Sequence, residues 1–173
     1  LGYAQLLDEI VTGKELEMLS KLKAAILQSV EIIRNVSTIR RIQERSQATR
    51  PMDLDPVIRS ELDHHADTSI HYDGTRASVC ANSLISEVFR NLIGNSVKFG
   101  GRGVQIWIQV TDGGDLVTVS VEDNGPGITD ELKPAIFNRF QRGGSSKSGK
   151  GLGLYICRMI VDGYGGRIWV ADR

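Results

Sequence analysis

Residues 104–121 read VQIWIQVTDGGDLVTVSV, and this stretch decides the fold class of the chain. Apolar residues stand at every second position of its first half, the segment TDGGD (111–115) is typical of a chain reversal, and the alternation then resumes. The alternating apolar residues are Val104, Ile106, Ile108 and Val110 before the turn and Val117, Val119 and Val121 after it. The pattern predicts an antiparallel β-hairpin that buries one face.

Helical and extended patterns surround this hairpin. A strong helix is predicted over residues 84–99 and a final helix over 152–162. The other predicted elements are a short helix over 55–65, weak strands near 68–72 and 77–80, and a last strand over 167–171. Helices and an antiparallel sheet in this order indicate an α+β fold, specifically a two-layer α/β sandwich.

A long amphipathic helix is predicted ahead of this domain, over residues 15–47, and residues 1–11 have the pattern of the end of an earlier helix. A turn at 12–14 would join the two into a helical hairpin. The apolar positions of the long helix are Leu16, Leu19, Leu22, Ile26, Val30, Ile33, Val36 and Ile39. The hairpin cannot bury this stripe alone, so it either packs on the main domain or forms a homodimeric four-helix bundle. The nearly heptad spacing favours the homodimer.

Prolines and aspartates at residues 47–56 predict a linker that divides the chain. We therefore expect two domains, a partial dimerisation hairpin over residues 1–48 and the main domain over 53–173.

The composition limits the class of protein. Lys plus Arg equals Asp plus Glu at 21 each among 173 residues, so no net charge favours nucleic acid or an anionic membrane as a partner. Cys80 and Cys157 lack metal-site spacing and are expected to be buried free thiols. Because no apolar run reaches the roughly 20 residues of a membrane span, a cytoplasmic location is expected. Membrane attachment of a longer protein through preceding segments stays open.

The helix that contains EVFRNLIGNSVKF (87–99) has an unusual polar face. At 100° per residue, Glu87, Asn91, Asn95 and Lys98 form one stripe opposite a broad apolar face. A solvated surface is the simplest interpretation, but asparagine is a poor helix former. Two carboxamide oxygens four residues apart can bind a hard divalent cation, and a lysine one turn further on can contact phosphate.

Two glycine-containing loops are further candidates. VEDNGPGIT (121–129) follows a predicted buried strand, so Asp123 could accept a hydrogen bond from a base amine while Gly125 and Gly127 let a ring approach the backbone; a plain turn has the same composition. GSSKSGKG (144–151) differs from the P-loop pattern at one position, because Gly151 replaces the serine or threonine that would bind magnesium. Gly149, Gly151 and Gly153 precede a helix whose first amides could bind phosphate.

Four of these stretches occur in an order that resembles a known family. NLIGNSVKF, DNGPGI, IFNRFQRG and GKGLGLYI are similar to the Asn box, first glycine box, Phe box and second glycine box of sensor histidine kinases. The ATP-binding domain of those kinases belongs to a superfamily shared with gyrase, a heat-shock chaperone and mismatch-repair ATPases, with the Bergerat-type fold. The long helix resembles the second helix of their dimerisation domain, so the resemblance covers nearly the whole chain.

The resemblance implies a complete site for ATP and Mg²⁺. Asn91 and Asn95 would hold Mg²⁺, Asp123 would bind the adenine amine, and Phe137 and Phe140 would anchor a lid over the nucleotide. Glu87, Asn91 and Arg142 would be the catalytic residues. The implied nucleotide-binding residues are Asn91, Asn95, Lys98, Asp123, Gly125, Gly127, Ile128, Phe140, Arg142, Gly149, Lys150, Gly151, Leu152, Gly153 and Leu154.

The family's phosphoacceptor histidine box is absent from the chain. His64, His65 and His71 lack the acid-Leu-Arg pattern that follows that histidine and are expected on the surface. The chain therefore resembles a fragment that binds nucleotide but does not phosphorylate itself. Whether the box precedes Leu1 in the natural protein is open.

The resemblance implies transfer of the ATP γ-phosphoryl to a histidine and then to an aspartate of a response-regulator receiver domain, with a sensor domain further upstream. One alternative is a serine kinase of the same fold that acts on an anti-sigma antagonist, although such kinases usually lack the long helix. The other is a non-catalytic, nucleotide-sensing dimerisation module.

Overall fold

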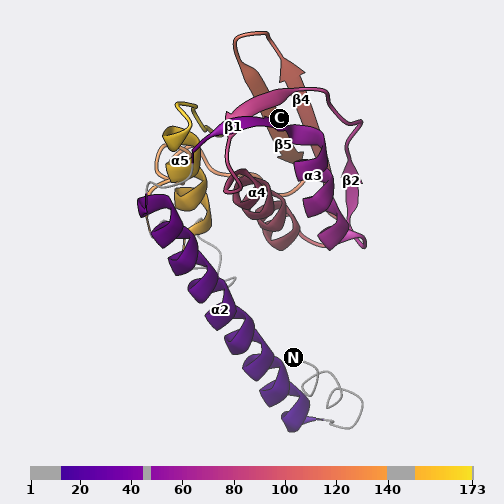
Figure 1. Ribbon diagram of the computed structural model, residues 1–173. Helices are drawn as coiled ribbons and strands as arrows, with labels where there is room; N and C mark the ends of the chain where they lie inside the picture. The colour runs from indigo at the N-terminus through magenta and orange to yellow at the C-terminus, as the bar shows by residue number, and fades with distance from the viewer. Residues whose placement is uncertain (1–12, 45–47, 140–150, 173) are drawn as a thin grey trace.

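The computed structural model describes residues 13–44, 48–139 and 151–172. Its most extended feature is helix α2 (Lys14–Gln43), which projects from an otherwise rounded domain (Figure 1). Gly13, with φ of 68°, precedes α2 in the left-handed conformation expected of a turn. The earlier helix predicted over residues 1–11 lies outside the described residues.

The main sheet has three strands in the order β2-β4-β5. β4 (Gln105–Asp112) and β5 (Val117–Asp123) form the predicted antiparallel hairpin, with Ile106 paired to Asp123. β2 (Ser69–His71) pairs with β4 in parallel, so the prediction of a purely antiparallel sheet was wrong. A helix intervenes between β2 and β4 along the chain, and such a crossover allows parallel pairing.

One strand of a second, two-stranded sheet lies in the stretch predicted as a linker. β1 (Arg50–Asp53) pairs antiparallel with β3 (Ser78–Ala81). Pro51 is compatible with this pairing because each strand of a two-stranded sheet has a free edge. Residues 50–53 are therefore ordered with the main domain, whereas the division at 1–48 and 53–173 stays a prediction.

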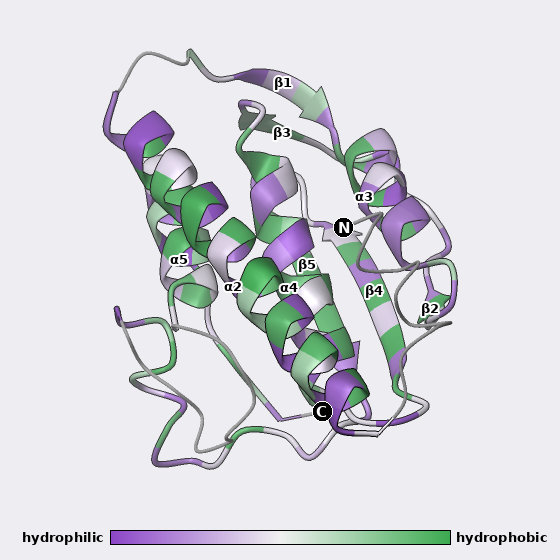
Figure 2. Cartoon of the chain, turned by 90° about the horizontal axis from the view of Figure 1, so that it is seen from below, coloured by the Kyte–Doolittle hydropathy of each residue, from purple (hydrophilic) through white to green (hydrophobic). Residues whose placement is uncertain are grey.

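The helices form the second layer. They are α3 (Leu54–Leu62), a 3₁₀ turn η1 (Asp63–His65), α4 (Ile85–Phe99) and α5 (Gly153–Gly163). α4 lies across β5 and beside α5, and the two-layer α/β arrangement confirms the predicted fold class (Figure 2). The fully buried side chains Leu54, Ile58, Ile93, Ile106, Ile156 and Cys157 come from both layers and form one core.

The predicted strand over residues 167–171 is not formed. Ile168 and Val170 are half-buried and their neighbours are exposed, so the alternation that suggested a strand is present. This alternation reports which side chains face the core, whereas a strand also needs a hydrogen-bonded partner, and residues 167–171 form no ladder.

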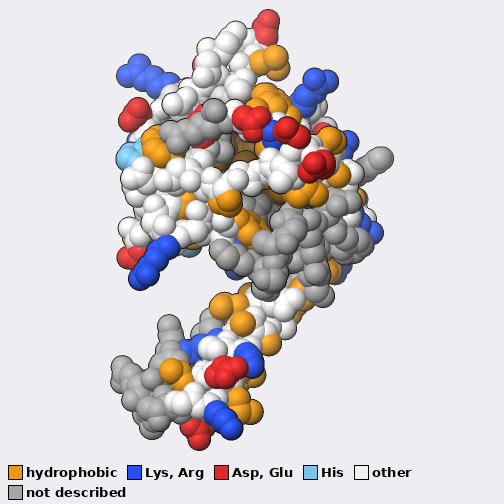
Figure 3. Space-filling view, turned by 180° about the vertical axis from the view of Figure 1, so that it is seen from behind, with side chains coloured by type: hydrophobic (Ala, Val, Ile, Leu, Met, Phe, Trp, Pro, Cys, Tyr) orange, Lys and Arg blue, Asp and Glu red, His pale blue; other side chains and the backbone are white. Residues whose placement is uncertain are grey.

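Helix α2 uses opposite faces for two purposes. Its carboxyl-terminal half packs on the domain through buried Asn35 and Thr38, and Arg41 Nη2 donates to Ser83 Oγ at 3.0 Å. Most of the predicted apolar stripe lies on the other face, where Ile33 is 70% exposed, whereas Leu19 is buried and Ile39 packs against the core. Hydrophobic side chains line the projecting helix in Figure 3. Exposed large residues of α2 are Leu16, Met18, Leu22, Ile26, Leu27, Val30, Ile33 and Val36.

The cysteines are both free, but only Cys157 is buried. The prediction for Cys80 was wrong because Cys80 lies on the face of β3 that is turned away from the core, between inward-facing Val79 and Ala81. Among the described residues, no helix combines the length and the apolar character that a membrane span requires.

Candidate nucleotide-binding site

The polar stripe of α4 lies at the amino-terminal end of α5. Asn91, Asn95 and Lys98 are half-buried, whereas Val88, Phe89 and Ile93 on the opposite face are buried in the core. Asn91 Nδ2 donates to the carbonyl oxygen of Glu87 at 2.9 Å. This hydrogen bond leaves Asn91 Oδ1 directed at α5, where a Cβ on Gly153 would lie only 2.6 Å from it.

The carboxylate of Asp123 is held at the end of β5. Its Oδ2 accepts the hydroxyl of Ser96 on α4 at 2.7 Å, and its Oδ1 accepts the amide of Gly125 at 2.9 Å. Each carboxylate oxygen has two lone pairs, so the oriented group can accept a further donor. The described loop of residues 123–128 therefore has an oriented acceptor at its start.

The two glycines of this loop differ in what surrounds them. A Cβ on Gly125 would lie 2.7 Å from both Asp123 Oδ1 and the Cα of Gly100, so the loop packs directly on the end of α4. Gly127 has a φ of 72°, which glycine adopts without strain, and no atom would contact a Cβ there within 4 Å. The following residue, Ile128, is half-buried.

The amino-terminal end of α5 is the third wall of the candidate site, after the polar face of α4 and the loop that follows β5. Gly151 has a φ of 64°, and buried Leu152 anchors the turn in the core. No side chain among residues 13–44, 48–139 and 151–172 caps the helix, so its first amide groups can donate to an anion. Gly153 and Leu154 are half-buried here, whereas Phe140, Arg142, Gly149 and Lys150 lie outside the described residues. The structure thus places Asn91 beside the start of α5 and connects Asp123 to the same helix, α4, through Ser96.

A protein-family model matches the part of the chain that contains this site. The model described as the histidine kinase-, DNA gyrase B- and HSP90-like ATPase matches residues 81–173, more than half of the chain. The chain belongs to this family. The match includes α4, the loop after β5 and α5, which are the three walls of the site.

Individual relatives are sensor histidine kinases. Sensor histidine kinase AruS of Pseudomonas aeruginosa strain PAO1 is 32% identical over 199 residues, which cover 100% of this chain and 19% of that protein. Sensor protein KdpD of Escherichia coli K12 is 40% identical over 108 residues, 61% of this chain and 11% of that protein. The chain thus spans about a fifth or less of the length of these curated relatives.

Solved structures agree with this assignment. The catalytic domain of histidine kinase ThkA is 31% identical, with a TM-score of 0.64, over 73% of this chain and 89% of that chain. The same kinase in complex with response regulator protein TrrA is 25% identical, with a TM-score of 0.63, over 99% of this chain and 52% of that chain.

The residues of this ATPase-family site fit an adenine nucleotide. Asp123 presents an oriented acceptor for an exocyclic amine, and the space beside Gly127, where a Cβ would meet no atom within 4 Å, leaves room for a ring to approach the backbone. Asn91 Oδ1 is directed at the start of α5, so a cation bound there would be near an anion at the helix amides. Amide oxygens are suitable ligands for Mg²⁺, which keeps much of its water shell in such sites.

Lys98 has a partner on α2. Its Nζ lies 3.7 Å from Glu31 Oε2, and it also lies over the ring of Phe99 at 5.5 Å from the centroid. The lysine predicted to contact phosphate is therefore paired with a carboxylate of the long helix.

Glu87 is in a different setting from the rest of the stripe. It is 9% exposed, and its Oε1 accepts Arg90 Nη1 at 3.0 Å. Its predicted catalytic role has no support from this contact, because a buried, ion-paired carboxylate is held in place, and the role stays a prediction.

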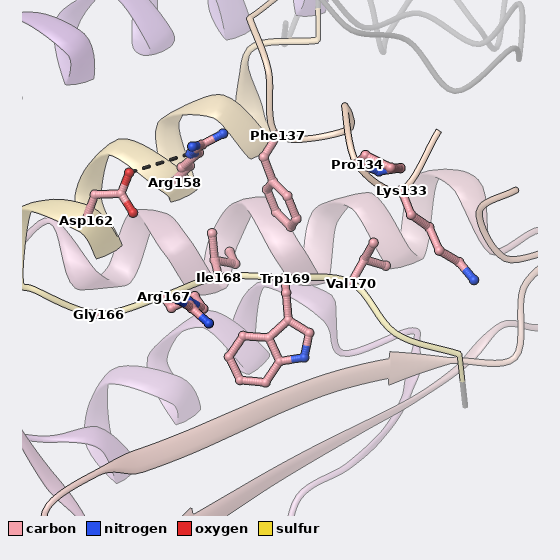
Figure 4. A pocket seen from close by; sticks show the side chains of 10 residues that line it. All are labelled: Lys133, Pro134, Phe137, Arg158, Asp162, Gly166, Arg167, Ile168, Trp169 and Val170. Atoms are coloured by element: carbon pink, nitrogen blue, oxygen red, sulfur yellow. Dashed lines mark ion pairs between the residues drawn. The ribbon is translucent and has the colours of Figure 1, made fainter. Parts of the chain in front are cut away.

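The predicted lid anchor Phe137 lies beside a cavity of about 490 Å³. Its ring points toward residues 166–170, and Arg158 of α5 forms an ion pair of 3.6 Å with Asp162 (Figure 4). The cavity lining contains none of the residues of the Asn stripe or the Asp123 loop.

The histidines are not part of the site. His64 and His71 are exposed, as predicted, and His71 stacks on Trp107 at 5.3 Å. His65 is half-buried.

Two residues of the site were missed in the sequence. Ser96 donates to Asp123, and Gly100 contacts Gly125. Their partners lie about two dozen positions further along the chain, so no local pattern identifies them.

Proposed function

We propose that this chain is the ATP-binding and catalytic region of a sensor histidine kinase. It binds Mg²⁺-ATP and delivers the γ-phosphoryl group to a histidine outside the chain, from which the group passes to an aspartate of a response regulator. The named relatives and the kinase solved with a response regulator support this proposal.

The observation that carries the proposal is the orientation of Asp123. Ser96 and Gly125 fix both carboxylate oxygens, although neither contact neutralises the charge. A fixed acceptor in a glycine-containing loop is suited to the amine of adenine, because an unpaired partner in such a site is costly. Asn91 supports transfer over hydrolysis, because an amide cannot take a proton from water.

Magnesium and phosphate would be bound on the other side of the pocket. Asn91 and Asn95 supply amide oxygens for Mg²⁺, while Lys98, Lys150 and Arg142 supply positive charge for phosphate. The magnesium ion would stabilise charge on the transferring phosphoryl group. Phe137 and Phe140 anchor a lid that excludes water when it closes.

The whole protein would work as a homodimer. The exposed apolar face of α2 supports dimerisation through the helical hairpin, since an unpaired stripe of this length is costly in water. A sensor domain upstream would control the kinase. Use of ATP implies that this region works in the cytoplasm.

Titration calorimetry with Mg²⁺-ATP tests the site. Asp123→Asn should weaken binding by roughly 10- to 100-fold, because a charge-assisted hydrogen bond contributes about 1.5–3 kcal/mol. Asp112→Asn is a matched control, since Asp112 also ends a strand and accepts the amide of the glycine two residues on, at 2.9 Å. Asn95→Ala should remove most of the difference between affinities measured with Mg²⁺ and with EDTA.

Equal weakening by the two aspartate variants would contradict the assignment of Asp123. The kinase reaction needs a longer chain that includes the preceding helix. γ-Labelled ATP should then produce a phosphohistidine that is labile in acid and stable in base, whereas acid-stable phosphoserine would favour the serine-kinase alternative.

A further inference from the structure

A cluster of two buried carboxylates and one half-buried guanidinium lies beside Asn91 on α4. Arg90 donates through Nε and Nη2 to the two oxygens of Glu61 at 3.1 and 2.9 Å, and through Nη1 to Glu87 at 3.0 Å. Glu61 and Glu87 are only 4% and 9% exposed. One guanidinium thus joins carboxylates from α3 and α4.

The charges of this cluster compensate one another in part. The guanidinium of half-buried Arg90 donates to both buried carboxylates, from Glu61 and Glu87. The carboxylate of Glu87 also acts on Cys157 of α5. Burial raises the pKa of this thiol to about 12, and the charge of Glu87 adds to the rise. The cluster therefore joins α3 to α4, and Glu87 lies on the helix that also packs against α5.

The cluster is connected to the candidate magnesium ligand through the backbone. Asn91 Nδ2 donates to the carbonyl oxygen of Glu87, the same residue whose side chain Arg90 holds. This donation directs Asn91 Oδ1 at Gly153, with no room there for a Cβ. A rotation of the first turn of α4 would move both the carbonyl acceptor and the amide oxygen.

We infer that Arg90, held between Glu61 and Glu87, is a positioning residue that fixes Asn91 for magnesium binding. The inference rests on the proposed Mg²⁺-ATP site and adds residues that do not touch the nucleotide. Removing one partner of a buried ion pair leaves an uncompensated charge, so the positions of Glu61 and Glu87 depend on Arg90. Two carboxylates against one guanidinium also leave a negative charge that attracts a cation.

Glu61→Gln and Arg90→Lys test this inference. Glu61→Gln keeps the size of the side chain but removes its charge, and Arg90→Lys keeps the charge but loses the planar fork that reaches both carboxylates. Calorimetry should show Mg²⁺-ATP binding weakened roughly five- to tenfold in both variants, below the tenfold to hundredfold cost typical of direct partners of metal ligands. Affinity for ATP in EDTA should stay within about twofold of the original chain.

Asp162→Asn is the matched control, because it removes a carboxylate from the exposed Arg158–Asp162 pair on α5. It should change neither affinity. Thermal denaturation without nucleotide separates stability from positioning. A lower melting temperature with an unchanged ratio of Mg²⁺ to EDTA affinities in Arg90→Lys would overturn the inference and leave the cluster a structural one. Failure of the unaltered chain to bind Mg²⁺-ATP would instead overturn the proposed function.

Discussion

At the scale of single residues, the start of α5 is defined by what Gly153 lacks. Its missing side chain lets Asn91 Oδ1 approach the helix start, where no side chain of the described residues caps the amide groups. A Cβ at this position would contact only the end of a flexible side chain, so Asn91 would shift and the helix would stay. Binding and stability should therefore respond differently to one added methyl group.

Gly153→Ala should weaken Mg²⁺-ATP binding by about tenfold or more, equivalent to about 1.4 kcal/mol. The free energy of unfolding should change by no more than about 1 kcal/mol, because alanine is the better helix former. Gly163→Ala at the other end of α5 is the control, since a Cβ there meets no atom within 4 Å. Calorimetry and thermal denaturation measure the two effects. Full affinity in Gly153→Ala would show that the position of Asn91 is not critical.

The candidate site could be predicted where its chemistry is local in the sequence. Asn91 and Asn95 share a helix face, and Asp123 and Gly125 share a loop, so their residue types and spacing suffice. Ser96 and Arg90 could not be identified in this way, because their importance comes from Asp123 and Glu61, at distances of 27 and 29 positions along the chain.

At the scale of secondary-structure elements, an ion pair connects α2 to α4. Glu31 of α2 pairs with Lys98 of α4 at 3.7 Å, and their side chains are 47% and 32% exposed. A phosphate group that recruits Lys98 would compete with this carboxylate.

Glu31→Gln should strengthen ATP binding by up to about fivefold at low salt, because exposed ion pairs contribute roughly 0.2–1 kcal/mol. The gain should disappear near 1 M salt, where the Debye length is about 3 Å. Glu17→Gln is the control on the same helix, since Glu17 pairs only locally with Lys21 at 2.6 Å. Titrations of both variants at two salt concentrations provide the measurement. Equal affinities in the two variants at low salt would refute competition for Lys98.

Elements were predictable where one periodicity extends over many residues. α2, α4, α5 and the β4–β5 hairpin all occur close to their predicted bounds. β1 was missed because Pro51 and the neighbouring aspartates look like a linker, and its pairing partner Cys80 lies far along the chain. For residues 167–171 the burial pattern was right, but pattern alone gives no information about hydrogen bonding between strands.

At the scale of the whole molecule, α2 works as a two-sided connector. Asn35 and Thr38 face the ATPase domain, whereas Ile33 and Val36 face away from it. One face of α2 thus packs on the domain, and the opposite face is available for dimerisation. The face left exposed in this chain is the more apolar one.

Ile33→Glu should prevent self-association of the chain through this exposed face. Burying one isoleucine contributes about 1.5–3 kcal/mol, and a buried unpaired carboxylate would add a further penalty, so the dimer dissociation constant should rise by at least about tenfold. Ala24→Glu is the matched control, because Ala24 is exposed about 180° around the same helix. Sedimentation velocity over a range of concentrations measures both variants. Equal loss of the dimer in both would assign the interface to another surface, and a monomer at every concentration of the unaltered chain would contradict dimerisation through the residues present here.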